Sequence, residues 1–308
     1  MKIIKLVILL FVSQVITAQN SAEITQFNEV LNQFMNVRDF CMSKDGTEAF
    51  FTIQSPGQEI SQLASLTMKN NIWSQPELLP FCDVFMYLEP FLSYDNKRLF
   101  FVSDRPLDAS SDHKKDFDIW YSDRSGKDAT WSEPKNMGKP VNSVLDEFYP
   151  SVSKNNNLYF TMVSPKGYGK DDLYVCKWED GSYSNPTLLN NNINSEGYEF
   201  NAFISEEEDF IIYSKYNEKD GQGSGDLYIS KKDADGEWKK PTNLGVPINS
   251  KYMDYCPFYD AQNQILYFTS KRNTLKSRKF SSISDLTSYL NQSHNGNSKI
   301  YRTSLSIE

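Results

Sequence analysis

The sequence predicts an all-β fold, a β-propeller of about five four-stranded blades closed by an N-terminal strand. Short stretches rich in aromatic and β-branched residues are separated by Asn, Gly, Asp and Pro turns, and helix signals are scarce. A composite motif recurs at intervals of 52 to 58 residues, a period that is typical of propeller blades. Each copy of this motif holds four short strands, which is the content of one blade.

The fourth strand of each copy carries the clearest marker, an aromatic residue followed three positions later by proline. An Asn-Ser pair closes the same segment in three copies, and an acidic residue follows each of these asparagines five positions later. The aromatic residues that precede a proline are Trp73, Trp131, Tyr183 and Trp238. The asparagines are Asn142, Asn194 and Asn249, and the acidic residues are Glu147, Glu199 and Asp254.

The other three strands follow in a constant order. The first strand has a Pro-x-x-Ser pattern, as in residues 150–153, and the second has a Leu-Tyr-Phe pattern, as in residues 158–160. The third strand opens with an aspartate, which we interpret as a turn residue because short polar side chains bond to nearby backbone. These aspartates are Asp118, Asp172 and Asp226.

The N-terminal region supplies the strand that the fifth copy lacks. The sequence ends after the third strand of that copy, and residues 27–36 align with residues 131–142 of a fourth strand. We therefore expect residues 25–34 to pair with residues 300–306, which would cover an exposed sheet edge. The alternative is a loose tail that lies beside the propeller.

Residues 1–18 have the layout of a cleaved signal peptide. Lys2 and Lys5 precede an apolar run at residues 6–16, and small and polar residues follow. The run is too short to cross a bilayer, which takes roughly 20 apolar residues. We expect a single propeller domain over residues 19–308, no membrane span, and a periplasmic or secreted location.

Charge and composition exclude several classes of function. A net charge of -8 argues against nucleic acid as a partner, because binding to it needs a positive surface. The four cysteines form no CxxC pair, so no zinc site is indicated, although one long-range disulfide is compatible with their number. The two histidines, His113 and His294, lie in polar segments without a nucleophile motif. We expect no cofactor and no metal.

Residues 226–250 and 146–153 resemble the TolB-like, WD-type propeller repeat family, especially the copies in exported Bacteroidetes-type proteins. The resemblance covers roughly residues 35–308. It implies a propeller in the periplasm or at the outer membrane, often fused in relatives to a peptidoglycan-binding domain of the OmpA type. This sequence ends on a propeller strand, so that role is not carried over. TolB itself is generally six-bladed, and the count of five comes from this sequence.

The repeated acidic residues Glu147, Glu199 and Asp254 are the candidates for catalysis. Each lies where the fourth strand of one blade leads into the first strand of the next, near the central channel. Glycoside hydrolases use such carboxylates as acid, base or nucleophile. Catalysis, however, requires carboxylates in unlike environments, whereas these three occupy equivalent positions. We expect a structural role, with ligand or cation binding and catalysis as alternatives.

Basic residues follow the second strands on the same face, and residues 271–298 are inserted there. The insertion carries a basic run and a short predicted helix with Ile283, Leu286 and Leu290 on one side behind a Ser cap. It would be a solvated loop, a lid over the channel or a partner contact. The candidate binding residues on this face are Arg105, Lys166, Lys215, Lys271, Arg272, Arg278 and Lys279.

Together these features predict a monomeric, non-catalytic module that binds a protein, peptide or glycan partner in the cell envelope. The alternative is a carbohydrate-active enzyme, a glycoside hydrolase or lyase, that uses Glu147, Glu199 and Asp254. Unequal burial and pairing of these acids would favour the enzyme. Identical hydrogen bonding in each repeat would favour the binding module.

Overall fold

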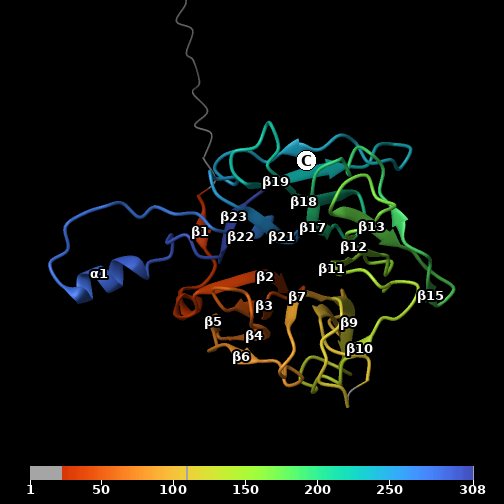
Figure 1. Cartoon of the computed structure of the whole chain (residues 1–308), viewed down its shortest axis with the longest axis horizontal. Coiled ribbons are helices and arrows are strands. Elements are labelled where there is room, and N and C mark those ends of the chain that lie inside the picture. Colours follow the sequence, from red (N-terminus) through yellow and green to blue (C-terminus); the bar gives the residue numbers. More distant parts are fainter. Residues whose placement is uncertain (1–22, 109, 308) are drawn as a thin grey trace, which may run out of the picture.

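The computed structural model describes residues 23–108 and 110–307, so the predicted signal peptide at residues 1–18 lies outside the described residues. Five small antiparallel sheets are arranged in a ring (Figure 1). The chain is therefore a five-bladed β-propeller, which confirms the predicted fold class. In the described part of the chain, no helix has the length and apolar character needed to cross a membrane.

In the first four blades the strands run from the channel outward in chain order, and in the fifth the N-terminal strand β1 (Thr25–Gln26) is the outermost. The first blade contains β2 (Asn36–Met42), β3 (Glu48–Gln54), β4 (Ser61–Lys69) and β6 (Glu77–Leu78), with β5 (Ile72–Trp73) extending β4 as a hairpin. The second contains β7 (Tyr87–Leu92), β8 (Arg98–Ser103), β9 (Asp118–Asp123) and β10 (Lys135–Asn136).

The third blade contains β11 (Glu147–Val152), β12 (Leu158–Met162), β13 (Asp172–Cys176) and β16 (Thr187–Leu188), with a side hairpin of β14 (Trp178–Glu179) and β15 (Ser182–Tyr183). The fourth contains β17 (Glu199–Ile204), β18 (Phe210–Tyr216), β19 (Gly225–Lys231) and β20 (Thr242–Asn243). The fifth contains β21 (Asp254–Asp260), β22 (Ile265–Ser270), β23 (Lys299–Ser304) and β1 (Thr25–Gln26).

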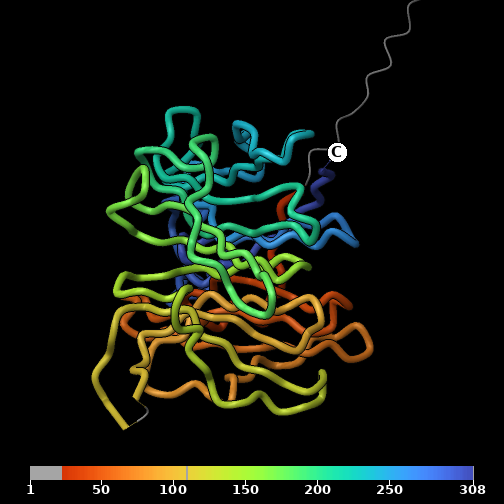
Figure 2. Tube along the Cα trace, turned by 90° about the vertical axis from the view of Figure 1, so that its right-hand side faces the viewer, coloured from red at the N-terminus to blue at the C-terminus, as the bar shows by residue number. Residues whose placement is uncertain are grey.

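The N-terminal strand β1 closes the ring, as predicted. Thr25 pairs with Arg302 and Gln26 with Tyr301, and the red N-terminal segment lies beside the dark-blue C-terminal strand (Figure 2). The strand is shorter than the predicted 25–34, because η1 (Glu29–Gln33) is a 3-10 helix. The side chain of Asn28 accepts a hydrogen bond from the backbone N–H of Val30 at 3.0 Å, and this cap starts the helical turn.

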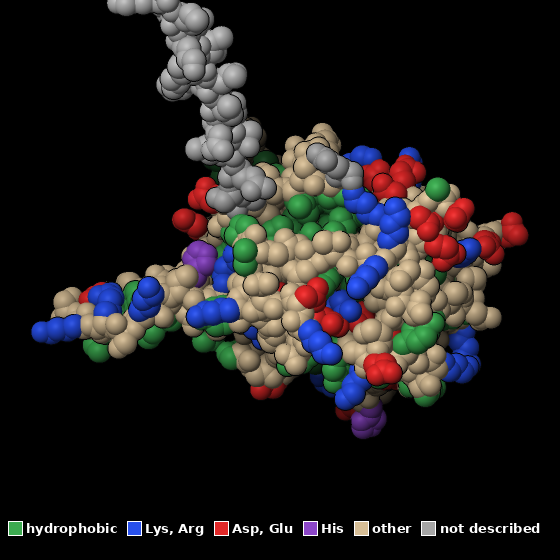
Figure 3. Space-filling model, turned by 90° about the horizontal axis from the view of Figure 1, so that it is seen from above, with side chains coloured by type: hydrophobic (Ala, Val, Ile, Leu, Met, Phe, Trp, Pro, Cys, Tyr) green, Lys and Arg blue, Asp and Glu red, His purple; other side chains and the backbone are tan. Residues whose placement is uncertain are grey.

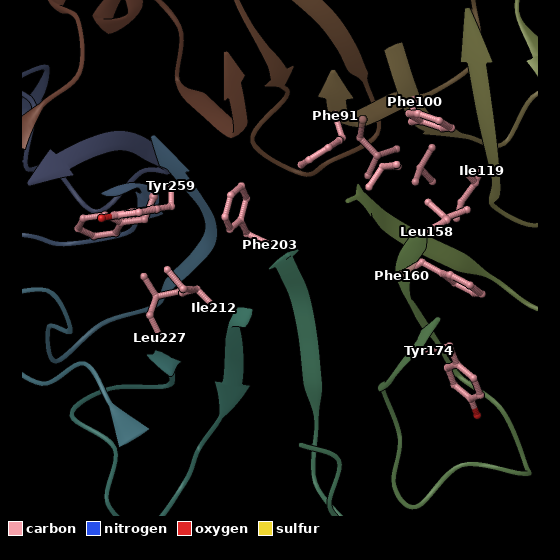
Figure 4. Close-up of a cluster of buried hydrophobic side chains, with 14 of the residues drawn as sticks. Phe91, Phe100, Ile119, Leu158, Phe160, Tyr174, Phe203, Ile212, Leu227 and Tyr259 are labelled. Carbon is pink, nitrogen blue, oxygen red and sulfur yellow. The ribbon is translucent and has the colours of Figure 1, made fainter. Parts of the chain in front are cut away.

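Apolar side chains fill the spaces between the blades. The largest buried cluster runs through the second to fifth blades, with Phe91, Phe160 and Phe203 among its members (Figure 4). The five innermost strands, β2, β7, β11, β17 and β21, contact one another around the central channel. Side chains on these strands therefore face a common axis although they come from distant parts of the sequence.

Residues 271–298, the predicted insertion, form a projection that we call the arm. It contains α1 (Ile283–Leu290), whose predicted cap is formed by Ser282, the side chain of which accepts a hydrogen bond from the N–H of Asp285 at 3.0 Å. The arm extends outward from the fifth blade rather than across the channel (Figure 1).

Candidate functional site

The three acidic residues singled out in the sequence have the same local bonding. Glu147, Glu199 and Asp254 each begin an innermost strand and are fully buried. Each carboxylate accepts hydrogen bonds from the backbone N–H and the hydroxyl of the serine four residues earlier. The serine Oγ to carboxylate distances are 2.5 Å from Ser143, 2.5 Å from Ser195 and 2.7 Å from Ser250. Through these hydrogen bonds the carboxylates stabilise the turn that leads into each blade.

The three acids differ in their cationic neighbours. The Nζ of Lys215 lies 3.4 Å from Glu199, and Arg272 lies 3.0 Å from Asp254. Glu147 has no ion pair with any described residue, and burial raises the pKa of its carboxyl to about 7. Burial also raises the pKa of Glu199. The repeated hydrogen bonds are thus identical, while the electrostatic surroundings are not.

The buried Glu147 predicts a pH-dependent stability. A carboxyl whose pKa is raised on folding stabilises the fold below the pKa of the unfolded chain, and this contribution is lost as the pH rises through the folded pKa. We expect the melting temperature to fall by a few degrees between pH 5 and pH 8, and to fall less in the Glu147→Gln variant. Glu196→Gln, at an exposed position, is the matched control. Parallel melting profiles for all three proteins would contradict this account.

The seven basic candidates do not form one patch. Arg105 donates a hydrogen bond to the Tyr87 hydroxyl at 3.3 Å and lies over the ring of Trp120. Arg272 is enclosed by the rings of Phe268 and Tyr301, and Lys215 bridges two glutamates. Lys271 is half-buried. The exposed candidates are Lys166 on the third blade and Arg278 and Lys279 on the arm.

A cluster of polar residues that the sequence analysis missed lies in the central channel. Every innermost strand contains a β-bulge, and one residue at each bulge has a positive φ between 50° and 60°. Bulges redirect side chains, and a left-handed backbone at residues other than glycine stores strain. The five residues are Asp39, Glu89, Tyr149, Asn201 and Cys256. The sequence does carry a signal for them. When the five copies of the first strand are aligned, this one position holds a different residue type in every copy, although the strand otherwise repeats.

Arg38 organises this channel cluster. Its Nε donates to Asp39 at 2.6 Å, and its Nη2 donates to Glu89 at 3.0 Å. The thiol of Cys256 also donates to Asp39 at 2.9 Å. Burial, reinforced by the nearby Asp39 carboxylate, raises the pKa of Glu89. Asp39 is 1% exposed and Glu89 is 4% exposed, so these carboxylates belong to the packed interior of the channel.

A pocket of about 510 Å³ opens on the face opposite to the one that the sequence analysis favoured. Its apolar lining includes Phe91, Phe203 and Phe258, which lie two residues after the bulge residues on three innermost strands and which we call its floor. The ring centroids of Phe203 and Phe258 are 5.4 Å apart. Those of Phe91 and Phe203, both labelled in Figure 4, are 6.4 Å apart. We call this the aromatic pocket.

Carboxylates dominate the rim of the aromatic pocket. The rim is formed by the turns between first and second strands, and its charged residues are Lys44, Glu206, Glu207, Asp209 and Asp260. Lys44 pairs with Glu206 at 3.1 Å, and Lys154, outside the pocket, pairs with Glu207 at 2.8 Å. Burial and the two nearby glutamates raise the pKa of Tyr94, which lines the wall. The pocket therefore combines an apolar floor with a net negative rim.

Neither metal-ligand clusters nor disulfides are present in the described residues. No group of three or more His, Cys, Asp or Glu side chains there is arranged to hold a metal ion. Cys41, Cys82, Cys176 and Cys256 all lie within the described residues, and all four are unpaired. Burial raises the pKa of the Cys82 thiol to about 12 and that of Cys176 to about 12. Such thiols are largely protonated at neutral pH and are poor nucleophiles.

Comparisons with known protein families and with curated proteins find no match. Among solved structures, a glycoside hydrolase is 9% identical with a TM-score of 0.56, and the match covers 89% of each chain. The catalytic domain of the Coprinopsis cinerea GH62 α-L-arabinofuranosidase is 8% identical with a TM-score of 0.52, over 91% of this chain and 93% of that domain. At these identities the similarity shows a shared propeller fold and nothing about activity.

TolB from Acinetobacter baumannii is a more distant match in shape. It is 11% identical with a TM-score of 0.47, over 87% of this chain and 54% of TolB. The chain thus spans about half the length of that protein. TolB propellers are therefore among the structural neighbours of this chain.

Proposed function

We propose that this chain is a non-catalytic binding module of the cell envelope, and that its aromatic pocket takes an apolar side chain from a peptide segment flanked by basic residues. The observation that carries the proposal is the three-phenylalanine floor beneath a rim of carboxylates. Concave, largely apolar sites with a few charged groups are typical of ligand pockets. The carboxylates add attraction for Lys and Arg that an uncharged glycan would not gain.

Two features support a non-catalytic role over a glycoside hydrolase or lyase. Glu147, Glu199 and Asp254 are equally buried, and each accepts hydrogen bonds from the serine four residues earlier, although among the described residues only Glu199 and Asp254 also pair with a cation. The other carboxylates near the axis, Asp39 and Glu89, are buried and paired with Arg38. A glycosidase needs two carboxyl groups on either side of a bound sugar, with room for the substrate between them. A periplasmic or secreted location remains our proposal from residues 1–18.

A labelled peptide tests the proposed pocket. The probe is the fluorescein-labelled hexapeptide Lys-Lys-Leu-Phe-Lys-Lys, and we expect it to bind with a micromolar Kd in fluorescence anisotropy. The same peptide with glutamates in place of the lysines should bind at least tenfold more weakly. Glu207→Lys should raise the Kd of the lysine peptide about fivefold, the equivalent of ~1 kcal/mol.

Glu133→Lys is the matched control, because Glu133 is exposed on the second blade and away from the pocket, and its Kd should equal that of the wild type. No saturable binding up to millimolar peptide would contradict the proposal. If the protein hydrolyses an oligosaccharide from a broad panel and Glu147→Gln or Glu199→Gln loses that activity, the binding-module proposal is wrong and the chain is an enzyme.

A further inference from the structure

The arm is an ordered element. Its base is closed by hydrogen bonds from the N–H of Thr274 to His294 O at 2.9 Å and from the N–H of Gly296 to Arg272 O at 3.2 Å. At its tip, the Arg278 guanidinium lies 4.4 Å from the ring centre of Phe280 and 4.5 Å from that of Tyr289. The same guanidinium pairs with Asp285 at 2.6 Å. These contacts fix α1 against the rest of the arm, and the Tyr301 hydroxyl on β23 donates a hydrogen bond to Ser293 O in the arm at 3.0 Å.

The tip of the arm presents apolar side chains on a basic background. Ile283 is 78% exposed and Leu290 is 48% exposed, and no residue of α1 is buried. Seven residues separate the two side chains, so they lie on the same side of the helix. The arm carries five basic residues and one acidic residue. Arg272 pairs with Asp254 and Arg278 with Asp285, so the exposed basic residues without an ion pair in the described part of the arm are Lys276 and Lys279. Figure 3 shows these blue and green side chains along the projection.

The arm and the aromatic pocket of one copy lie on opposite faces. The arm begins where β22 ends, and the turn at the start of β22 contributes Asp260, Ala261 and Gln262 to the pocket wall. Six strand residues separate these ends, which amounts to about 20 Å. Because the arm also extends outward from the ring (Figure 1), it does not reach its own pocket.

We propose that the arm of one copy docks in the aromatic pocket of a second copy, which rests on the proposed function of that pocket. Ile283 and Leu290 would pack on the phenylalanine floor, and the exposed lysines beside them would face Glu206 and Glu207. Complementary charge favours this occupant over an acidic partner. The contact is head-to-tail, so an open chain of copies always has one free arm and one free pocket at its two ends. Such a chain either grows further or closes into a ring. This departs from the monomer that the sequence predicted.

Sedimentation velocity tests self-association of the chain from residue 19 onward. We expect the average mass to rise with concentration between about 5 and 500 µM at low salt, and to return to that of a monomer in 1 M NaCl because salt screens the charges. The arm variant Ile283→Asp/Leu290→Asp and the pocket variant Glu206→Lys/Glu207→Lys should each remain monomeric. Ile72→Asp, at a position that is 72% exposed on the first blade, is the control and should associate like the wild type.

Mixing the two defective variants distinguishes this arrangement from any symmetric contact. The arm variant keeps an intact pocket and the pocket variant keeps an intact arm, so the mixture should form a heterodimer and nothing larger. Monomers at every concentration of wild type, or a mixture that stays monomeric, would overturn the proposal. If the lysine peptide binds the pocket while the wild type stays monomeric, only this inference fails. If neither binds, the proposed function fails as well.

Discussion

The Phe27→Ala variant is expected to melt about 10 °C below the wild type. Phe27 is 7% exposed, and its ring centre lies 4.7 Å from that of Phe40, 5.5 Å from that of Trp73 and 5.7 Å from that of Tyr267. Removing a buried phenylalanine costs about 3–5 kcal/mol. In a domain of this size, each kcal/mol lowers the melting temperature by about 2–4 °C.

The size of this effect follows from how the ring is closed. The closing strand β1 has only two residues, so its ladder with β23 contributes few hydrogen bonds, and one more runs from the N–H of Phe27 to Ile300 O. Phe27 and Leu31 then pack between the first and fifth blades. The side chains therefore do most of the stabilisation at the closure. Melting curves followed by circular dichroism measure it.

Met35→Ala is the matched control, because Met35 follows the same segment but is 58% exposed. Its melting temperature should stay within about 1 °C of the wild type, as is usual for surface substitutions. Deleting residues 23–34 should destabilise the propeller more than Phe27→Ala does, since it also exposes the edge of β23. If Phe27→Ala had the same melting temperature as the wild type, the N-terminal closure would not stabilise the propeller.

The fold could be predicted because the residues that recur in each copy of the repeat determine the backbone conformation. The side chains of Asn142, Asn194 and Asn249 each bond to both the N–H and the C=O of one residue in the third strand of the preceding blade. No other side chain of this length can both accept and donate in this way, so any substitution loses at least one of the two bonds. The spacing of these asparagines in the sequence therefore indicates where one blade ends and the next begins.

The features that were missed depend on contacts between distant segments. A bulge shifts which side chains face the channel, so the alternation within a strand does not identify Glu89 or Phe91 as channel residues. The aromatic pocket draws its floor from three strands whose first and last members are more than 160 residues apart. The short form of β1 was missed for a local reason, because Asn28 caps η1 where a strand was expected.

The candidate site was predicted only in part for the same reason. The acidic residues at the blade entrances were recognised from their repetition, and their turn-stabilising bonds are equally repetitive. The channel cluster differs in every blade, and no repeated pattern describes it. Its buried charges therefore had to be found from the structure, and they are the place where a single substitution should have the second largest effect.

Replacing Arg38 with methionine removes the cation that serves both Asp39 and Glu89. Breaking one side of a buried ion pair costs about 3–5 kcal/mol, because the remaining charges are left in the interior without compensation. We expect a loss of this size in urea unfolding at pH 8. Burial already raises the pKa of Glu89 in the presence of the arginine, and without it the carboxyl should take up a proton more readily.

Acid should therefore rescue the Arg38→Met variant in part. A carboxyl with a raised folded pKa is destabilising above that pKa and is relieved as the pH falls, so the difference from the wild type should shrink from pH 8 to pH 5.5. Arg278→Met is the matched control, because it breaks the exposed pair with Asp285, and its urea midpoint should match the wild type at both pH values. An equal loss at pH 8 and pH 5.5 would mean that Arg38 acts through packing rather than charge. No loss at all would mean that the channel cluster does not support the propeller.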